Sequence, residues 1–136
     1  MTFEIKNVNP PEMGAPLGLY RQISRVRASE FIFIAGQLAV DRSGAVIGKG
    51  DFDAQMKQVF TNIDVALRSA DCSFANVVKF TTYLVHSQDI ELFMATRKKL
   101  FPTLFPNGEY PPNTLVIVDR LVQEEFLVEV ETTAAQ

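Results

Sequence analysis

The chain has 136 residues, of which 47% are hydrophobic and 21% are charged, and its formal net charge is −3. This length and composition are typical of one folded domain, residues 1–136, with an apolar core. The acidic balance argues against a nucleic-acid-binding surface, which needs clustered Lys and Arg. No apolar run approaches the ~20 residues that span a bilayer, so membrane insertion is excluded.

The first half of the chain begins with short strands. The pattern favours strands at Thr2–Val8 and Arg21–Val26, and the apolar run Phe31–Ile34 predicts a third strand that Gly36 interrupts. The residues Asp-Arg-Ser-Gly at positions 41–44 are typical of a turn.

A helix over Asp51–Ala70 is the clearest predicted element. Its apolar residues recur at steps of three and four, as on the buried face of an amphipathic helix. They are Phe52, Met56, Val59, Phe60, Ile63, Ala66, Leu67 and Ala70. Asp51 and Asp53 suit an N-terminal cap and the positive end of the helix dipole.

A strand and a second helix are predicted next. Residues Asn76–His86 are rich in β-branched and aromatic types, which favours a central strand. Helical spacing returns over Asp89–Phe101, and Pro102 is expected to stop this helix. The inward stripe of this helix includes Arg97, an unusual residue for a buried face.

Two final strands are predicted at Thr114–Val118 and Phe126–Glu131, and the residues between them favour a hairpin. The resulting order, strands, helix, strand, helix and two strands, indicates an α+β fold. Two helices cover only one face of such a sheet, yet Thr114–Val118 is apolar on both faces. We expect a second copy of the chain to cover the other face. The alternative is a solvent-facing sheet with scattered apolar residues.

Few residues are candidates for chemistry. A metal site needs several convergent ligands, and one His and one Cys far apart in the sequence predict none. No Gly-rich phosphate loop is present, so no nucleotide cofactor is expected. His86 is interpreted as a loop-end residue rather than a general base, and Cys72 as a buried small hydrophobe rather than a redox thiol. The single cysteine and the absence of a signal-peptide pattern predict a cytoplasmic protein.

Six short segments, in their order and spacing, resemble the Rid family, also called YjgF or endoribonuclease L-PSP-like. They are Ala15–Gln22, Ile34–Leu38, Gln55 with Asn62, Val77–Thr81, Pro111–Thr114 and Val128–Glu131. The resemblance implies a chorismate-mutase-like α+β fold, with a mixed sheet that carries two helices on one face. It also implies a homotrimer whose sheets form a central barrel at the other face, with a cleft at each subunit interface. Well-characterised members are hydrolases of reactive enamines and imines that release ammonia and a carbonyl product without a cofactor.

The resemblance assigns roles to two residues. Tyr20 matches a tyrosine that lines the cleft. Glu129 matches the glutamate that holds or activates the attacking water, a plausible catalytic base in a partly dry site, and Glu131 is then secondary. The competing interpretation is that Tyr20 and Glu129 only bond across the subunit interface. Glu129 and Glu131 share one face of a strand, which also suits two solvated carboxylates.

Two positions depart from the family pattern. Deaminases carry an arginine that grips the substrate carboxylate where this chain has Asn113. Many members have Ser-Gly-Gln where this chain has Ala35-Gly36-Gln37, so a hydroxyl that lines the cleft is missing. Asparagine does not replace the arginine's charge, and deamination of small imino acids is therefore in question.

Arg97 offers a replacement for the missing charge. It falls where deaminases often carry a cleft-facing asparagine, and it lies on the inward stripe of its helix. We hypothesise that Arg97 binds an acidic or carbonyl ligand while Asn113 and Thr114 form hydrogen bonds with it. The alternative is an Arg97 that reaches the solvent, or that pairs with Glu129 or another carboxylate.

Three functions follow, in descending order of support. The first is a cofactor-independent hydrolase of enamine or imine metabolites, with catalytic Glu129 and ligand contacts from Tyr20, Ala35, Arg97, Asn113 and Thr114. The second is a non-catalytic module that binds or senses a small metabolite. The third is an endoribonuclease, which the acidic net charge disfavours.

Overall fold

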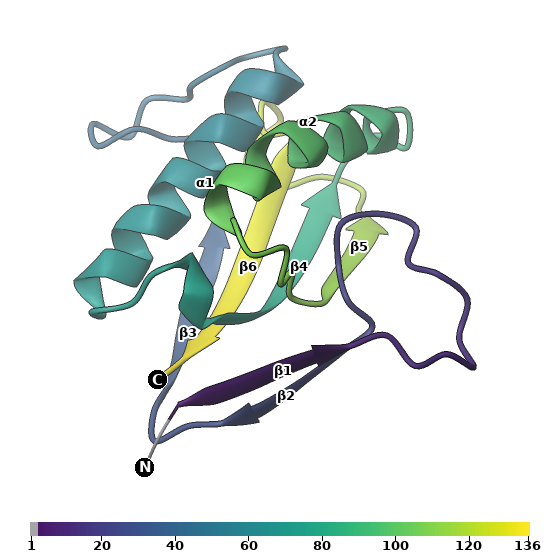
Figure 1. Cartoon of the computed structure of the whole chain (residues 1–136). Helices are drawn as coiled ribbons and strands as arrows, with labels where there is room; N and C mark the ends of the chain where they lie inside the picture. Colours follow the sequence, from purple (N-terminus) through teal and green to yellow (C-terminus); the bar gives the residue numbers. More distant parts are fainter. Residues whose placement is uncertain (1–2) are drawn as a thin grey trace.

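The computed structural model describes residues 3–136. Its main sheet has four strands, β3 (Phe31–Gln37), β4 (Val77–Leu84), β5 (Asn113–Ile117) and β6 (Val128–Ala135). They lie in the order β3-β6-β4-β5, and only the β4-β5 pair is parallel. Both helices pack on one face of this mixed sheet (Figure 1). The α+β fold with two helices on one face is therefore confirmed.

The expected hairpin between the last two strands is wrong. β4 lies between β5 and β6, so the two strands are not neighbours. β5 follows β4 through a helix, and such a crossover brings the next strand back parallel to the first. The final strand also begins at Val128 rather than at Phe126, because the N–H of Leu127 bonds a side chain instead of a neighbouring strand.

Helix α1 spans Phe52–Ser69 and agrees with the predicted range to one residue at each end. Asp51 is the N-cap, and its Oδ1 accepts a hydrogen bond from the Ala54 N–H at 3.1 Å. This bond satisfies one of the free N–H groups of the first turn. The predicted cap is confirmed.

Helix α2 spans Asp89–Leu104, so the expectation that Pro102 stops it is wrong. A proline removes one helical hydrogen bond, here the bond to the carbonyl of Lys98, a residue that water reaches. Beyond the proline, buried Phe101 and Phe105 pack with ring centroids 5.2 Å apart. The Phe105 N–H donates to the Phe101 carbonyl at 2.7 Å. Packing therefore holds the last turn despite the proline.

The N-terminal strands are β1 (Glu4–Val8) and β2 (Ile23–Arg27), and they form a separate antiparallel pair. Of the predicted strand Thr2–Val8, Thr2 lies outside the described residues. Residues 9–22 connect β1 to β2 as a long loop on one side of the molecule (Figure 1). The Gln22 N–H donates to Asn9 Oδ1 at 2.9 Å and ties the two ends of this loop together.

Strand β3 continues through Gly36, which was expected to interrupt it. The register of β3 against β6 nevertheless shifts between Ile34 and Gln37, so the glycine marks an irregularity in the ladder. Such a bulge bends a strand and redirects its side chains.

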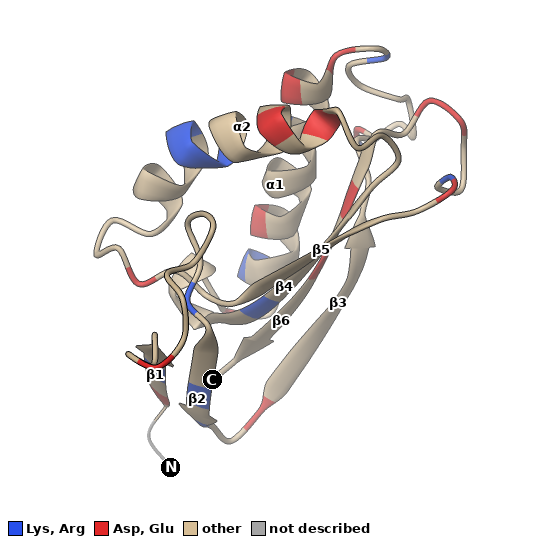
Figure 2. Ribbon diagram, turned by 90° about the vertical axis from the view of Figure 1, so that its right-hand side faces the viewer, with Lys and Arg blue, Asp and Glu red and all other residues tan. Residues whose placement is uncertain are grey.

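The two faces of the sheet differ in what covers them. In β6, Val128 and Val130 are fully buried against the helices, whereas Glu129 points to the opposite face. We call this opposite face the open face. Phe31 and Phe33 of β3 lie on it and are 51% and 78% exposed. Figure 2 shows the open face free of helices. Two helices leave an apolar face uncovered, as the sequence predicted.

Gln55 of α1 links the helix to two loops. Its side chain is completely buried, and its Nε2 donates to the carbonyls of Gly48 (3.1 Å) and Glu125 (2.9 Å). Its Oε1 accepts the Leu127 N–H at 2.9 Å. The amide thereby fixes the chain immediately before β6.

We expect Gln55→Leu to lower the free energy of unfolding by about 3 kcal/mol, because it strands buried backbone groups without partners. Urea denaturation measures this change. Gln58→Leu on the same helix is the control, since Gln58 is half-buried and its side chain bonds only Asn62 among the described residues. It should cost less than about 1 kcal/mol. Equal losses in the two variants would contradict the anchoring role of Gln55.

Candidate functional site

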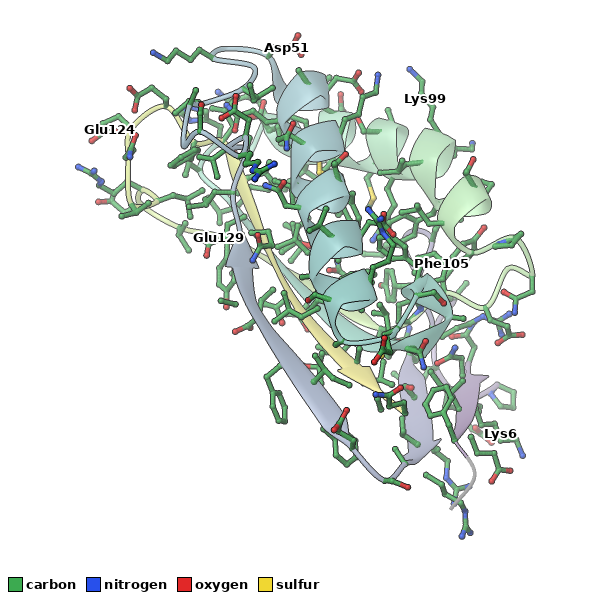
Figure 3. The ribbon with its side chains drawn as sticks, turned by 90° about the vertical axis from the view of Figure 1, so that its left-hand side faces the viewer. Lys6, Asp51, Lys99, Phe105, Glu124 and Glu129 are labelled. Carbon is green, nitrogen blue, oxygen red and sulfur yellow. The ribbon has the colours of Figure 1, made fainter. Side chains whose placement is uncertain are left out.

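A hollow on the open face contains the first group of candidate residues. It has a volume of about 210 Å³. Its lining residues are Gly36, Tyr83, Val118, Arg120, Leu121, Glu129 and Glu131. Glu129 lies directly opposite Tyr83 in the β4-β6 ladder, and both side chains point away from the helices. Figure 3 shows Glu129 beside the end of β3.

Gly36 makes room for the Glu129 carboxylate. A Cβ at position 36 would overlap Glu129 Oε2 and would lie 2.7 Å from its Cδ. Real side chains do not tolerate such a contact, so any other residue at this position would displace the carboxylate. The irregular register of β3 and the missing side chain at Gly36 together define the position of Glu129.

The environment of Glu129 increases the proton affinity of its carboxylate. Partial burial is the main cause that raises the pKa of this carboxyl above its ordinary value, and the negative charge of Glu131 raises it further. Arg120 does not neutralise the pair, because its guanidinium bonds the carbonyls of Leu121 and Val122 and the carboxylate of Glu124. A carboxylate with a raised pKa is a better proton acceptor than an ordinary one.

Arg97 lies on the helix side of the sheet and is only 2% exposed. Its guanidinium carbon is 4.8 Å from the centroid of the Phe93 ring, 5.6 Å from that of Tyr20 and 5.9 Å from that of Phe101. No carboxylate of residues 3–136 lies within ion-pair distance of it. The structure therefore contradicts the solvent-reaching alternative for Arg97 and shows no carboxylate partner for it within residues 3–136.

Asn113 and Thr114 point to opposite faces of β5. Asn113 lies beside Phe80 in the ladder, and its Oδ1 accepts a hydrogen bond from the buried Thr82 hydroxyl at 2.8 Å on the helix side. Thr114 accepts one from Lys79 Nζ at 2.6 Å on the open face. Ala35 is exposed on β3.

Within one chain, the candidate residues thus form two separate groups. Arg97 and Tyr20 are in contact on the helix side, where Asn113 also points. Glu129, Thr114 and the exposed Ala35 belong to the other face. The sheet separates the two groups.

The sequence pattern does not indicate Tyr83 and Arg120 as residues of the hollow, and it gives Gly36 only as a strand break and as part of a motif. Tyr83 was open to prediction, since alternation along β4 places it on the same face as Thr81 and away from the buried Thr82. Arg120 follows β5 in an irregular segment, and no periodic signal places it.

Other candidates lie outside both groups. His86 is exposed after β4, and Cys72 is buried with its thiol pKa raised mainly by burial, as expected of an unreactive cysteine. Within residues 3–136, no group of three or more His, Cys, Asp or Glu is arranged to hold a metal ion. None of the helices in this range is long and apolar enough to cross a membrane.

Comparison with known proteins places the chain in a family. The model of the endoribonuclease L-PSP family matches residues 12–136. The chain belongs to this family, which includes the Rid and YjgF proteins. A RutC family protein of Synechocystis is 33% identical over 131 residues, which cover 96% of this chain and 95% of the relative.

Two further relatives are informative. A Bos taurus protein named 2-iminobutanoate/2-iminopropanoate deaminase is 33% identical over 101 residues, 74% of this chain and 72% of the relative. The crystal structure of a Rid protein of unknown function from Yersinia pestis, YyfB, superimposes with a TM-score of 0.86 at 28% identity and covers 97% of this chain and 98% of that one. The fold of this chain is therefore the Rid fold.

We expect Glu129→Gln to stabilise this Rid-family chain at neutral pH. Because the pKa of Glu129 is higher in the folded protein, the unfolded chain loses this proton at a lower pH than the folded protein does. The stability of the wild type therefore falls as the pH rises from the ordinary pKa of 4.5 through the raised pKa of the folded state. Glutamine removes this loss. Thermal denaturation at several pH values should show no advantage for the variant well below pH 4.5 and a growing advantage above it. The raised pKa would be contradicted if the variant matched the wild type at low pH but was less stable than the wild type at neutral pH.

Proposed function

We propose that the protein is a cofactor-independent hydrolase of enamines or imines, with Glu129 as the base that activates water. The observation that carries this proposal is the Glu129 carboxylate, held in a small hollow by the space at Gly36 and poorly neutralised by its surroundings. Membership of the endoribonuclease L-PSP family and the similarity to a protein named as an imine deaminase support it.

The reaction needs only water. Glu129 accepts a proton from a water molecule whose oxygen bonds to the carbon of the C=N group, and the C=N π electrons move to nitrogen, which takes up a proton. The amino group of the resulting carbinolamine takes up a proton and leaves as ammonia, while the hydroxyl loses its proton and the C=O bond forms. An enamine first gains a proton on carbon and loses one from nitrogen to become the imine. The sum is imine plus water to carbonyl compound plus ammonia.

We propose further that the site is completed in a homotrimer. The open face carries exposed Phe31 and Phe33, and an uncovered apolar face of this kind marks an interaction surface. In a trimer whose sheets line a central barrel, the open-face hollow of one copy would meet the helix-side residues of the next. Tyr20 and Asn113 would then contact the ligand together with Glu129, Thr114 and Ala35.

A second candidate function is a small-metabolite-binding module without turnover. Two observations favour it. The side-chain oxygen of Asn113 already accepts a hydrogen bond from Thr82, and Ala35 has no side-chain hydroxyl. Binding that saturates without product release would distinguish this function from hydrolysis.

We expect purified protein to accelerate the hydrolysis of at least one imine from a panel generated in situ by oxidation of aliphatic, acidic and aromatic primary amines. Semicarbazide trapping of unreacted imine and ammonia release measure the rate. Glu129→Gln should lower kcat/KM by about 100-fold because the base is lost.

Gly36→Ala should lower kcat/KM similarly, since its Cβ displaces the Glu129 carboxylate. Gly14→Ala is the matched control, because a Cβ there meets nothing within 4 Å, and its rate should equal that of the wild type. Rates no higher than buffer with every imine would contradict hydrolysis. Full activity in Glu129→Gln would contradict the assigned base.

A further inference from the structure

The guanidinium of Arg97 lacks the acceptors that a buried arginine needs. Its Nη1 is buried and has no hydrogen-bond partner within the described chain, and its Nη2 donates only to the sulfur of Met94 at 3.1 Å. A thioether is a weak acceptor, whereas a guanidinium presents five N–H donors. The donors of this side chain are therefore largely unsatisfied.

The aromatic rings around Arg97 do not replace those acceptors. Phe93, Tyr20 and Phe101 attract the positive charge through their faces. They accept no in-plane N–H bond of the kind that a carboxylate accepts. Buried charges in proteins are normally paired, because burial without a partner is costly. Burial lowers the pKa of Arg97 to about 10, so the group is still charged at neutral pH.

The loop of residues 9–22 covers this cation. Leu19 packs against the core, whereas residues 11–15 are exposed. Gly18 lies against the guanidinium. A Cβ at this position would overlap Arg97 Nη2 and would lie 3.2 Å from Arg97 Cζ and 3.1 Å from Met94 Sδ. Leu17, next in the loop, is 84% exposed. The Tyr20 hydroxyl accepts the Leu17 N–H at 3.2 Å, so the loop bonds mainly to itself. Segments with few buried apolar contacts open at low free-energy cost.

We propose that Arg97 is the anion-binding residue of a site beneath the 9–22 loop, which takes a carboxylate attached to an apolar body. The planar fork of the guanidinium matches the two oxygens of a carboxylate. The rings of Tyr20, Phe93 and Phe101 and the sulfur of Met94 suit the apolar part of such a ligand. The binding site stands without hydrolysis. Only the identification of the anion as the substrate's own carboxylate rests on the proposed function.

Binding of simple carboxylates and their uncharged amides tests the site. The pairs are acetate with acetamide, butanoate with butanamide, and benzoate with benzamide, at constant ionic strength. Isothermal titration should show that the wild type binds at least one carboxylate about tenfold more tightly than its amide, because only the charged ligand satisfies the guanidinium. Thermal denaturation should show the same preference as stabilisation.

Three variants locate the binding. Arg97→Met keeps the length and apolar contacts of the side chain, and it should lose the preference for carboxylate. Gly18→Ala keeps the positive charge but displaces the Arg97 guanidinium, and it should weaken carboxylate binding about tenfold. This variant still tests the site if Arg97→Met folds poorly. Gly14→Ala, in the same loop, should bind as the wild type does.

Either of two results overturns the proposal. The first is a wild type that binds no carboxylate of the panel more tightly than its amide. The second is undiminished carboxylate binding in Arg97→Met and Gly18→Ala. Because binding is measured without turnover, a protein that binds carboxylates but hydrolyses no imine would refute the hydrolase and leave the anion site intact.

Discussion

The alternation of side chains along β6 is the constraint on which the rest of the structure depends. Val128 and Val130 are fully buried beneath the helices, so the intervening Glu129 has to point to the other face. A shift of one residue would bury the carboxylates and expose the valines. Gln55 fixes this register from the helix side by bonding the chain just before β6. Core packing thus sets the position of the candidate base.

Two glycines adapt this frame to its charged groups. Gly36 leaves room for Glu129 on the open face, and Gly18 allows the loop backbone to approach Arg97 on the helix side. Each charged group is partly or wholly removed from water and forms no ion pair within residues 3–136. This pattern is typical of functional sites, where burial and poor neutralisation adjust reactivity and binding at the expense of stability.

Local patterns predicted much of the fold and part of the site. The helical period located α1 and placed Arg97 on an inward face, because that period depends only on neighbouring residues. The apolar pattern of β5 could not reveal its neighbour, so a hairpin was expected where β4 intervenes. Pro102 was misjudged since two buried rings hold the helix end. The role of Gly36 could not be predicted, because it consists in leaving space for the Glu129 carboxylate, and that contact exists only in the folded chain.

The central claim is that the fold holds Glu129 as a poorly solvated carboxylate of raised pKa. Titration of the Glu129 side-chain carboxyl by carbon-13 NMR tests this claim most directly, in the wild type and in Glu131→Gln. The account predicts a midpoint above the ordinary 4.5 in the wild type and a lower midpoint in Glu131→Gln, where the neighbouring charge is gone. A wild-type midpoint at or below 4.5 would contradict the account.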